Sequence, residues 1–442
     1  MSKRSRRKKI PTDTITTTVE SLNHEGRGVA HVNGKTTFLF GGLPGETVSF
    51  RYTQCHRKYD EGTVIEVITS NENRVTPKCA HFGTCGGCAL QHLSIDRQRK
   101  HKEAVLLEHF QHQAQCVPAN IAPPLFAEPF GYRRRARLSV RYVIKKEKVL
   151  VGFRERQSHY VAELTQCETL HPTVGLQLKA LGELLSHLKI KTNIPQIEVS
   201  IGDNATAVVV RHMSSIADID QEKLIAFAQE KNWQLYFQPN TTDSIHPIFP
   251  ANPDPLFYDL KTQNIRIYFK PSHFTQINAA INAQMVTRAI DWLDLQKTDR
   301  VLDLFCGIGN FSLSMARYGH SVVGIEGSEA AIMQAKENAI ANQLVNTAFY
   351  THDLTKVSAE SWYQTSYDKI LLDPPRAGAL ELLENIAIWQ PKRIVYVSCN
   401  PITLGRDTRF LLQLGYQLDK AGVMDMFPHT EHIEAMALFI KK

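Results

Sequence analysis

The chain has 442 residues and a formal net charge of +7, and its 43% hydrophobic and 21% charged residues are typical of a globular protein. At ~150 residues per domain, this length corresponds to about three domains. No apolar run reaches the ~18 residues of a membrane span, and no apolar segment follows the basic start as in a secretory signal, so we expect a cytoplasmic protein without membrane contact.

The positive charge is concentrated in two blocks. Residues 1–9 carry six Lys or Arg and no acid, whereas residues 131–156 carry ten Lys or Arg against two Glu. Such blocks indicate a polyanionic partner, and the missing membrane signals favour nucleic acid over lipid. We interpret residues 1–11 as a basic disordered tail, for which RNA binding and simple solubility are equally good explanations.

Residues 12–70 are expected to form a small closed barrel. Turn signals at Asn33-Gly34 and Gly41–Gly45 separate five short, strand-like segments at the spacing of such barrels. The sequence GGLPGETV at Gly41–Val48, preceded by Glu25–Gly28, resembles the TRAM domain, an OB-like barrel that binds RNA. The predicted strands are Thr14–Val19, Gly28–Val32, Lys35–Phe40, Thr47–Thr53 and Gly62–Ile68.

A cysteine cluster follows the barrel. Cys79, Cys85 and Cys88 have the spacing C-x5-C-x2-C with glycines between them, and Cys167 can supply a fourth thiolate. Small residues allow a loop to wrap around a metal, and four thiolates suit either zinc or an iron–sulfur cluster. Because a reducing compartment disfavours disulfides, the spacing predicts a metal centre and leaves the identity of the metal open.

Residues 71–255 are expected to form a β-rich central domain that ends in a proline-rich boundary. From Arg135 to Arg141, arginine or serine alternates with apolar residues, which on a strand places the arginines on one face and the apolar side chains on the other. Arginines two residues apart can follow a phosphate backbone. Residues 93–118, partly helical in pattern, are a candidate for packing with the C-terminal domain, residues 256–442, instead.

Residues 256–442 show strands alternating with helices, the pattern of a doubly wound α/β domain. The buried-strand run Val301–Phe305 leads into the glycine-rich turn Cys306–Asn310, which allows a ligand to approach the backbone closely. The later strands end in polar residues, and open α/β sheets bind their ligands at this edge. These residues are Glu326, Asp353, Asp373-Pro374-Pro375-Arg376 and Ser398-Cys399-Asn400-Pro401.

The cofactor expected at this edge is S-adenosylmethionine. The G-x-G-x-x-G pattern of nicotinamide sites is absent, and the arrangement resembles class I S-adenosylmethionine-dependent methyltransferases with a Rossmann-like fold. The resemblance implies that the glycine turn passes the methionine part of the cofactor. It also implies that Glu326 holds the ribose and that Asp353 lies near the adenine.

Cys399 is the candidate nucleophile. A buried structural cysteine is the commonest alternative for a lone Cys. Its place at a strand end beside the methyl donor favours catalysis, because a thiolate that adds to C6 of a pyrimidine makes C5 reactive toward a methyl group. Removal of the C5 proton then needs a base, and a stacked target base must first be flipped out.

The base is expected in the segment from Phe427 to Glu434. His429, His432 and Glu434 are each a possible metal ligand. Their spacing, H-x-x-H-x-E, differs from the helical H-E-x-x-H spacing of zinc proteases. A solvated polar loop is the other interpretation, particularly for His429 and Glu431.

Taken together, the motifs resemble the RNA uracil-5 methyltransferase family, over essentially the whole chain after the basic tail and most closely in the branch that acts on 23S ribosomal RNA. The resemblance implies C5 methylation of a uridine, expected to be uridine 1939 of that RNA, by a monomeric enzyme. The motifs that carry it are FTQIN at Phe274–Asn278, DLFCGIGNF at Asp303–Phe311, DPPR at Asp373–Arg376, SCNP at Ser398–Pro401 and HTEHIE at His429–Glu434.

The resemblance also implies roles for individual residues. Cys399 is expected to be the nucleophile and Glu434 the base that removes the C5 proton. A [4Fe–4S] cluster is implied on Cys79, Cys85, Cys88 and Cys167. The residues implied to contact S-adenosylmethionine are Gln276, Phe305, Asn310, Glu326, Asp353 and Asp373.

Other functions explain part of the sequence. The nearest alternative is a transfer-RNA uracil-5 methyltransferase, a branch that we expect to lack both the barrel and the cysteine cluster. An exocyclic-amine methyltransferase explains Asp373-Pro374-Pro375 but neither Cys399 nor Glu434. A non-catalytic RNA-binding or ribosome-assembly protein explains the barrel and the arginine strand but gives no reason for Cys399 and Glu434 beside a cofactor site. A radical methylthiotransferase needs a C-x3-C-x2-C spacing, which is absent.

Overall fold

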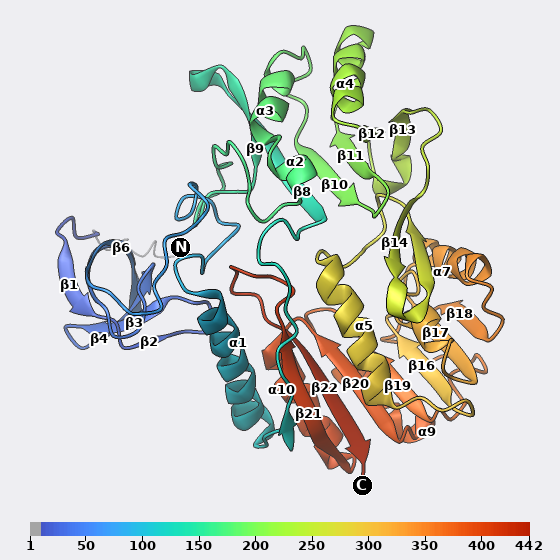
Figure 1. Ribbon diagram of the computed structural model, residues 1–442. Helices are drawn as coiled ribbons and strands as arrows, with labels where there is room; N and C mark the ends of the chain where they lie inside the picture. Colours follow the sequence, from blue (N-terminus) through green and yellow to red (C-terminus); the bar gives the residue numbers. More distant parts are fainter. Residues whose placement is uncertain (1–9) are drawn as a thin grey trace, which may run out of the picture. The chain divides into compact units, whose positions relative to one another are not determined.

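The computed structural model describes residues 10–442 (Figure 1), so the basic tail predicted at the start of the chain lies largely outside the described residues. No helix in the described part is both long and apolar enough to cross a membrane. The chain divides into two compact units. The first comprises residues up to Lys102 with Glu155–Ser158 and Phe427–His432, and the second comprises Glu103–Arg154, His159–Met426 and Ile433–Lys442.

The first unit contains the barrel. Its strands pair in the order β1-β5-β6-β4-β3-β2, and because β1 and β2 are successive pieces of one strand, this sheet closes on itself. The fully buried side chains of Val19, Ala30, Leu39, Val48 and Phe50 fill the interior, as period-two alternation on a barrel strand requires. The strands are β1 (Ile15–Thr18), β2 (Ser21–Leu22), β3 (Gly28–Val32), β4 (Lys35–Phe40), β5 (Thr47–Cys55) and β6 (Tyr59–Thr69).

The cysteine segment differs from the prediction, and the expectation of a central domain with an iron–sulfur cluster is wrong for this structure. Across residues 10–442, no group of three or more His, Cys, Asp or Glu side chains is placed to hold a metal ion. Cys79, Cys85 and Cys88 belong to the first unit, whereas Cys167 belongs to the second. The described residues therefore do not form the expected metal centre.

Other contacts order this segment. The backbone N–H of Cys79 donates to the side chain of Gln91 at 3.1 Å. The ring of Phe82 packs against the rings of His92 and Phe40 at centroid distances of 5.4 and 5.7 Å. Burial of His92 lowers its pKa to about 4, so the imidazole is neutral at physiological pH and packs as part of an apolar cluster.

In the second unit, a six-stranded sheet with the order β13-β12-β11-β10-β8-β9 forms the central domain. Helices α3 (Leu178–Ser186) and α4 (Asp218–Glu230) lie beside it (Figure 1). On β8, Leu138 is fully buried while Arg137 and Arg141 are exposed, as the alternation predicts. The strands are β8 (Arg135–Val143), β9 (Lys148–Gly152), β10 (Gln196–Ile201), β11 (Thr206–Arg211), β12 (Trp233–Gln238) and β13 (His246–Phe249).

The arginine face of β8 does not carry charge of a single sign across the sheet. Glu198 of β10 lies opposite Arg137 in the register, and the two side chains form an ion pair at 3.2 Å. The neighbouring strand, which sequence alternation along β8 could not reveal, therefore offsets part of the positive charge.

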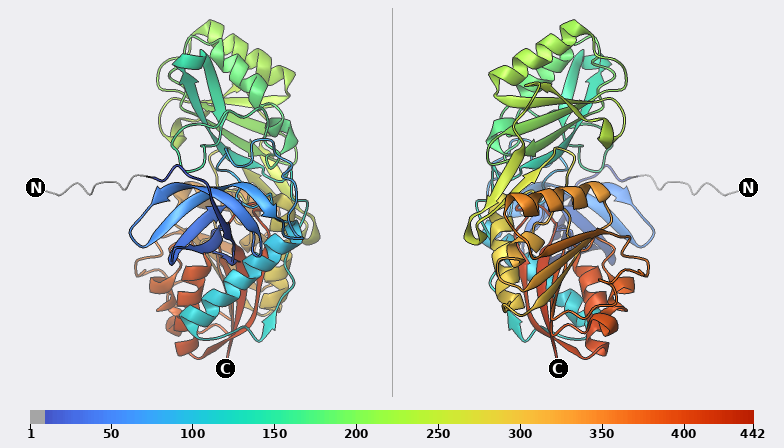
Figure 2. Two further views of the ribbon diagram at one scale, coloured as in Figure 1. Left: turned by 90° about the vertical axis from the view of Figure 1, so that its left-hand side faces the viewer. Right: turned by 90° about the vertical axis from the view of Figure 1, so that its right-hand side faces the viewer.

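The C-terminal sheet also lies in the second unit and has the order β18-β17-β16-β19-β20-β22-β21-β7. Its five strands from β18 to β20 are parallel, and β22 runs antiparallel to β20. Figures 1 and 2 show helices on both faces of this sheet. The strands are β7 (Asn120–Ile121), β16 (Arg300–Leu304), β17 (Ser321–Glu326), β18 (Thr347–Thr351), β19 (Lys369–Leu372), β20 (Arg393–Ser398), β21 (Tyr416–Met424) and β22 (Glu434–Lys441), and the main helices are α5 (Ala279–Leu293), α7 (Glu329–Ala341) and α10 (Pro401–Gln413).

Helix α1 (Ile95–His109) ends in the core of this domain. Leu106 and the following Phe110 are at most 1% exposed and belong to the same hydrophobic cluster as Leu302 of β16 and Tyr396 of β20. This helical segment, which precedes β8 in sequence, thus completes the core of the C-terminal sheet.

A hairpin of β14 (Leu256–Leu260) and β15 (Ile265–Phe269) is fixed on α7 by two asparagines. The Asn338 amide exchanges hydrogen bonds of 2.9 and 3.0 Å with the backbone of Tyr268, and the Asn342 amide exchanges bonds of 2.8 and 2.7 Å with that of Arg266. Each side-chain amide bonds to both the N–H and the C=O of one residue of β15, as the backbone of a neighbouring strand would. The hairpin therefore forms a firm wall beside the carboxyl ends of β16 and β17.

Candidate active site

The glycine-rich turn after β16 has an unusual backbone. Phe305, Gly307 and Gly309 have φ values of 68°, 54° and 94°, in the left-handed region. The backbone N–H groups of Phe305 and Cys306 both donate to the carbonyl of Ile325, at 2.9 and 3.0 Å. A non-glycine residue such as Phe305 is held there only when its surroundings demand it, and such strain is common at functional sites.

Glu326, the last residue of β17, reaches back to this turn. Its two carboxylate oxygens accept hydrogen bonds from the backbone N–H groups of Ser328, at 3.0 Å, and Gly307, at 3.3 Å. The carboxylate is thereby fixed at the strand end, with lone pairs left to accept hydroxyl groups of a ligand.

A cavity of about 530 Å³ opens above the turn. This is the size of a small-molecule site. The structure brings together five of the six residues that were predicted to contact the cofactor: Gln276, Phe305, Asn310, Glu326 and Asp373 all line the cavity.

Asp353, the sixth residue, is not among the lining residues. Its carboxylate is exposed and accepts hydrogen bonds from the side chain and backbone of Thr355, and it forms an ion pair with Lys356 at 3.0 Å. These hydrogen bonds lower its pKa to about 2. Its predicted place near an adenine ring therefore stays a prediction.

The amide of Asn310 is held in place by two residues that sequence reasoning missed. Its oxygen accepts from the hydroxyl of Tyr258 at 2.9 Å, and its amide exchanges hydrogen bonds of 2.9 and 3.0 Å with that of Asn282. The three residues are far apart in the chain, so no local sequence pattern predicts these hydrogen bonds.

Two carboxyl groups lie near the turn, Asp303 fully buried and Asp373 half-buried. Burial and, to a smaller extent, the charge of Asp373 raise the pKa of Asp303 to about 7, against a hydrogen bond from Ser312. Burial also raises the pKa of Asp373 to about 7. A positively charged ligand in the cavity would favour the ionised form of both. Asp303 was not among the predicted site residues, although an acid inside the apolar run VLDLF was a visible signal.

Cys399 and Glu434 meet across two antiparallel strands. The last printed pair between β20 and β22 is Ser398 opposite Ala435. Continuing this register by one residue sets Cys399 opposite Glu434, and side chains of such pairs lie on the same face of a sheet. The structure thus brings together the two residues that were predicted to be nucleophile and base.

The Cys399 thiol is protonated at neutral pH in this arrangement. Burial and, to a smaller extent, the negative charge of Glu434 raise its pKa to about 11, while Arg376 acts in the opposite direction. A nucleophilic thiolate here requires a base, or additional positive charge from a bound ligand.

The loop that carries Cys399 is tied to the loop that carries Arg376. The Asn400 side chain and the Thr403 hydroxyl both donate to the carbonyl of Arg376, at 3.0 and 3.3 Å. Asn400 also caps α10, since its side chain accepts from the N–H of Ile402 at 3.1 Å. These bonds fix the position of the thiol relative to the cavity edge at Asp373.

His429 does not belong to a solvated loop, contrary to one of the two sequence interpretations. It is 5% exposed, and its backbone N–H and Nδ1 both bond to the side chain of Gln98, at 2.9 and 3.2 Å. Its carbonyl accepts from the backbone N–H groups of Ala89 and Leu90, both at 2.9 Å. Within the first unit, the residue orders the segment that leads to β22.

The chain matches two known protein families. Residues 256–442 match the family described as tRNA (Uracil-5-)-methyltransferase, and residues 10–65 match the TRAM domain. The "23S rRNA (uracil(1939)-C(5))-methyltransferase RlmD" of Hahella chejuensis is 46% identical over 99% of both chains. The protein of the same name from Alcanivorax borkumensis is 44% identical, over 99% of this chain and 98% of its own.

The fold is also similar to that of a solved transfer-RNA enzyme. The Pyrococcus abyssi tRNA (uracil-54, C5)-methyltransferase, in complex with S-adenosyl-L-homocysteine, has a TM-score of 0.73 and 22% identity, and the match covers 96% of this chain and 100% of that one. A tRNA enzyme can therefore have nearly the whole of this architecture. The expectation that the set of domains alone separates the ribosomal from the transfer-RNA branch is thus wrong.

Proposed function

We propose, because the chain belongs to the family of the 23S rRNA (uracil-C5)-methyltransferases RlmD, that it transfers the methyl group of S-adenosylmethionine to C5 of a uridine in 23S ribosomal RNA. The observation that carries the proposal is the pair Cys399–Glu434 at the same edge of the sheet as the cavity lined by Asp373 and the glycine turn. A nucleophile, a base and a cofactor cavity at one sheet edge meet the needs of C5 methylation.

The proposed reaction begins at the thiol. Cys399 loses its proton to solvent, and its sulfur adds to C6 of the uracil, which makes C5 electron-rich. C5 then takes the methyl group from the sulfonium of the cofactor, and the S–CH₃ electron pair stays on sulfur as S-adenosylhomocysteine forms. Glu434 removes the proton from C5, the C5–C6 double bond returns, and the thiolate leaves.

The cofactor is expected to bind through the residues around the turn. Glu326 accepts hydrogen bonds from the ribose hydroxyls, while Gln276, Phe305, Asn310 and Asp373 contact the rest of the molecule. Its positive sulfonium, placed near Cys399 and Asp373, would lower the pKa of both groups and so favour the thiolate. Asp353 is kept in the set of proposed contacts from the family resemblance alone.

The RNA is expected to bind to the TRAM barrel and to the arginines of β8. Arg137 and Arg141 are exposed on one face of their sheet, and TRAM domains resemble OB-like RNA-binding barrels. Uridine 1939 is the proposed target because the full-length relatives carry that position in their names. A monomer acting in the cytoplasm is the corresponding proposal for assembly and location.

Transfer of a labelled methyl group tests this function. The protein, labelled S-adenosylmethionine and a 23S rRNA fragment that includes uridine 1939 should give 5-methyluridine at that position. A fragment with cytidine at that position is the matched control and should stay unlabelled. Labelling of transfer RNA alone would keep the chemistry and overturn the proposed substrate.

A further inference from the structure

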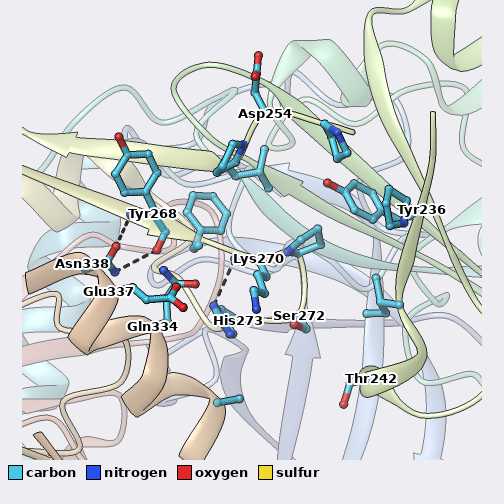
Figure 3. A pocket seen from close by; sticks show the side chains of 18 of the residues that line it. Tyr236, Thr242, Asp254, Tyr268, Lys270, Ser272, His273, Gln334, Glu337 and Asn338 are labelled. Atoms are coloured by element: carbon cyan, nitrogen blue, oxygen red, sulfur yellow. Dashed lines mark hydrogen bonds between the residues drawn. The ribbon is translucent and has the colours of Figure 1, made fainter. Parts of the chain in front are cut away.

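A second cavity, of about 800 Å³, adjoins the proposed cofactor cavity within the second unit (Figure 3). Five residues line both spaces: Thr242, Asp243, Ser272, His273 and Ala330. The reaction proposed above assigns no role to the second cavity, because the first is already of the size of a small-molecule site.

One of the shared residues, Ala330, lies at the end of the cofactor cavity that is away from the reaction. The order β17-β16-β19-β20 separates Ala330, just after β17, from Cys399, just after β20, with the glycine turn of β16 between them. A cofactor with its sulfonium toward Cys399 therefore has its other end toward the second cavity.

The lining of the second cavity is suited to polar, positively charged molecules. Gln334 of α7 is only 6% exposed and makes no hydrogen bond to the described part of the chain, so its amide is available to a ligand. Figure 3 shows Gln334 and Glu337 on one side of the cavity and Asp254 on another. An amide that lines a cavity in this way can donate to and accept from a ligand or water there.

The charges around the cavity are mainly negative. Asp243, Asp254 and Glu337 line it against Lys270, and none of these four side chains forms an ion pair with the described residues. Burial lowers the pKa of His273 to about 4, so this ring adds no positive charge. Such a lining repels RNA phosphates and attracts cations. S-adenosylmethionine carries a net positive charge, whereas S-adenosylhomocysteine carries none.

We propose that the second cavity is the passage through which S-adenosylmethionine enters and S-adenosylhomocysteine leaves while RNA occupies the Cys399 side. The proposal rests on the proposed function, since it takes the first cavity as the cofactor site. The negative lining accelerates entry of the charged donor and holds the neutral product less strongly. Cofactor exchange then does not require release of the RNA.

Bulky residues that narrow the passage without touching the cofactor cavity provide the test. Glu337→Trp on α7 and Asp254→Trp in the loop before β14 change residues that line the second cavity and not the first. Lys336→Trp is the matched control, because Lys336 is exposed on the same helix and lines neither cavity. Rapid filtration with labelled S-adenosylmethionine gives association and dissociation rate constants, with and without the 23S fragment, in a Cys399→Ala background that prevents turnover.

We expect both Trp variants at the cavity to slow association and dissociation by about ten-fold, with Kd changed by less than about two-fold, and the control to match the parent. The effect should be largest with RNA bound. Unchanged rate constants in both variants would overturn the proposal. Faster dissociation with a weaker Kd would also overturn it, because it would make these residues cofactor contacts. If the protein that retains Cys399 binds S-adenosylmethionine but methylates no RNA, the proposed function is refuted. The comparison of rate constants between the variants would still be valid.

Discussion

Glu434 lies opposite Cys399, one residue beyond the pair of Ser398 and Ala435 that joins β20 to β22. Its negative charge contributes to raising the pKa of the thiol. The pair thus has a resting state in which the thiol is protonated at neutral pH. Catalysis, on our account, begins when a bound cofactor and substrate shift that balance.

Replacement of Glu434 should make Cys399 more reactive toward an alkylating reagent in the ligand-free protein. Because the thiol pKa is raised to about 11, alkylation should accelerate with pH up to that value. Glu434→Gln removes a negative charge, lowers the pKa and should accelerate alkylation at pH 8 by about three- to ten-fold. Mass spectrometry of the Cys399 peptide measures the rate. Glu381→Gln, at an exposed position, is the control and should leave the alkylation rate of Cys399 unchanged. Slower alkylation in Glu434→Gln would contradict the proximity of Glu434 to Cys399.

Glu326→Gln should weaken binding of S-adenosylmethionine by about ten-fold or more. The neutral amide loses charge-assisted hydrogen bonds to the ligand and cannot accept from both Gly307 and Ser328 as the carboxylate does. Isothermal titration calorimetry gives the Kd. Glu329→Gln, three residues along the chain, is the control, and equal affinities for the two variants would remove Glu326 from the site.

Asp303 should make stability depend on pH in a definite direction. Its pKa is raised to about 7 by burial, so between pH 4 and 7 the folded protein keeps a proton that the unfolded chain loses. The free energy of unfolding should therefore fall as pH rises through this range. Asp303→Asn should have a Tm that exceeds that of the parent by more at pH 8 than at pH 5. Asp291→Asn, at an exposed position, should change Tm relative to the parent by the same amount at both pH values. If Asp303→Asn also changed Tm equally at pH 5 and pH 8, the raised pKa of Asp303 would be refuted.

Removing the exposed arginines of β8 should lower both the affinity for RNA and its dependence on salt. Arg137→Ala with Arg141→Ala should reduce the slope of log K against log salt by about one to two, since each phosphate contact contributes about one. Filter binding at several salt concentrations measures the slope. Lys179→Ala on α3 is the control. An unchanged slope in the double variant would move the phosphate contacts to another surface.

Much of the fold could be predicted because local chemistry determines it. Turn residues separate the barrel strands, and the strict alternation around Leu138 marks β8. Polar residues after successive parallel strands must meet at one sheet edge, and this rule placed Glu326 and Asp373 beside the cavity.

What could not be predicted depends on contacts between distant parts of the chain. The support of Asn310 by Tyr258 and Asn282 has no local pattern. Burial of His429 comes from Gln98, more than 300 residues earlier in the sequence. The metal centre was predicted from cysteine spacing. Spacing shows where thiols occur in the chain, but it does not show which of them meet in space.

The most direct test of the central claim is a covalent trap. A 23S rRNA fragment with 5-fluorouridine at position 1939, incubated with the protein and S-adenosylmethionine, should give a protein–RNA adduct on a denaturing gel, because the fluorine leaves no C5 proton for Glu434 to remove. The account predicts that the adduct forms with the parent protein and disappears with Cys399→Ala. An adduct that persists in Cys399→Ala, or none with a parent protein that binds both RNA and cofactor, would contradict it.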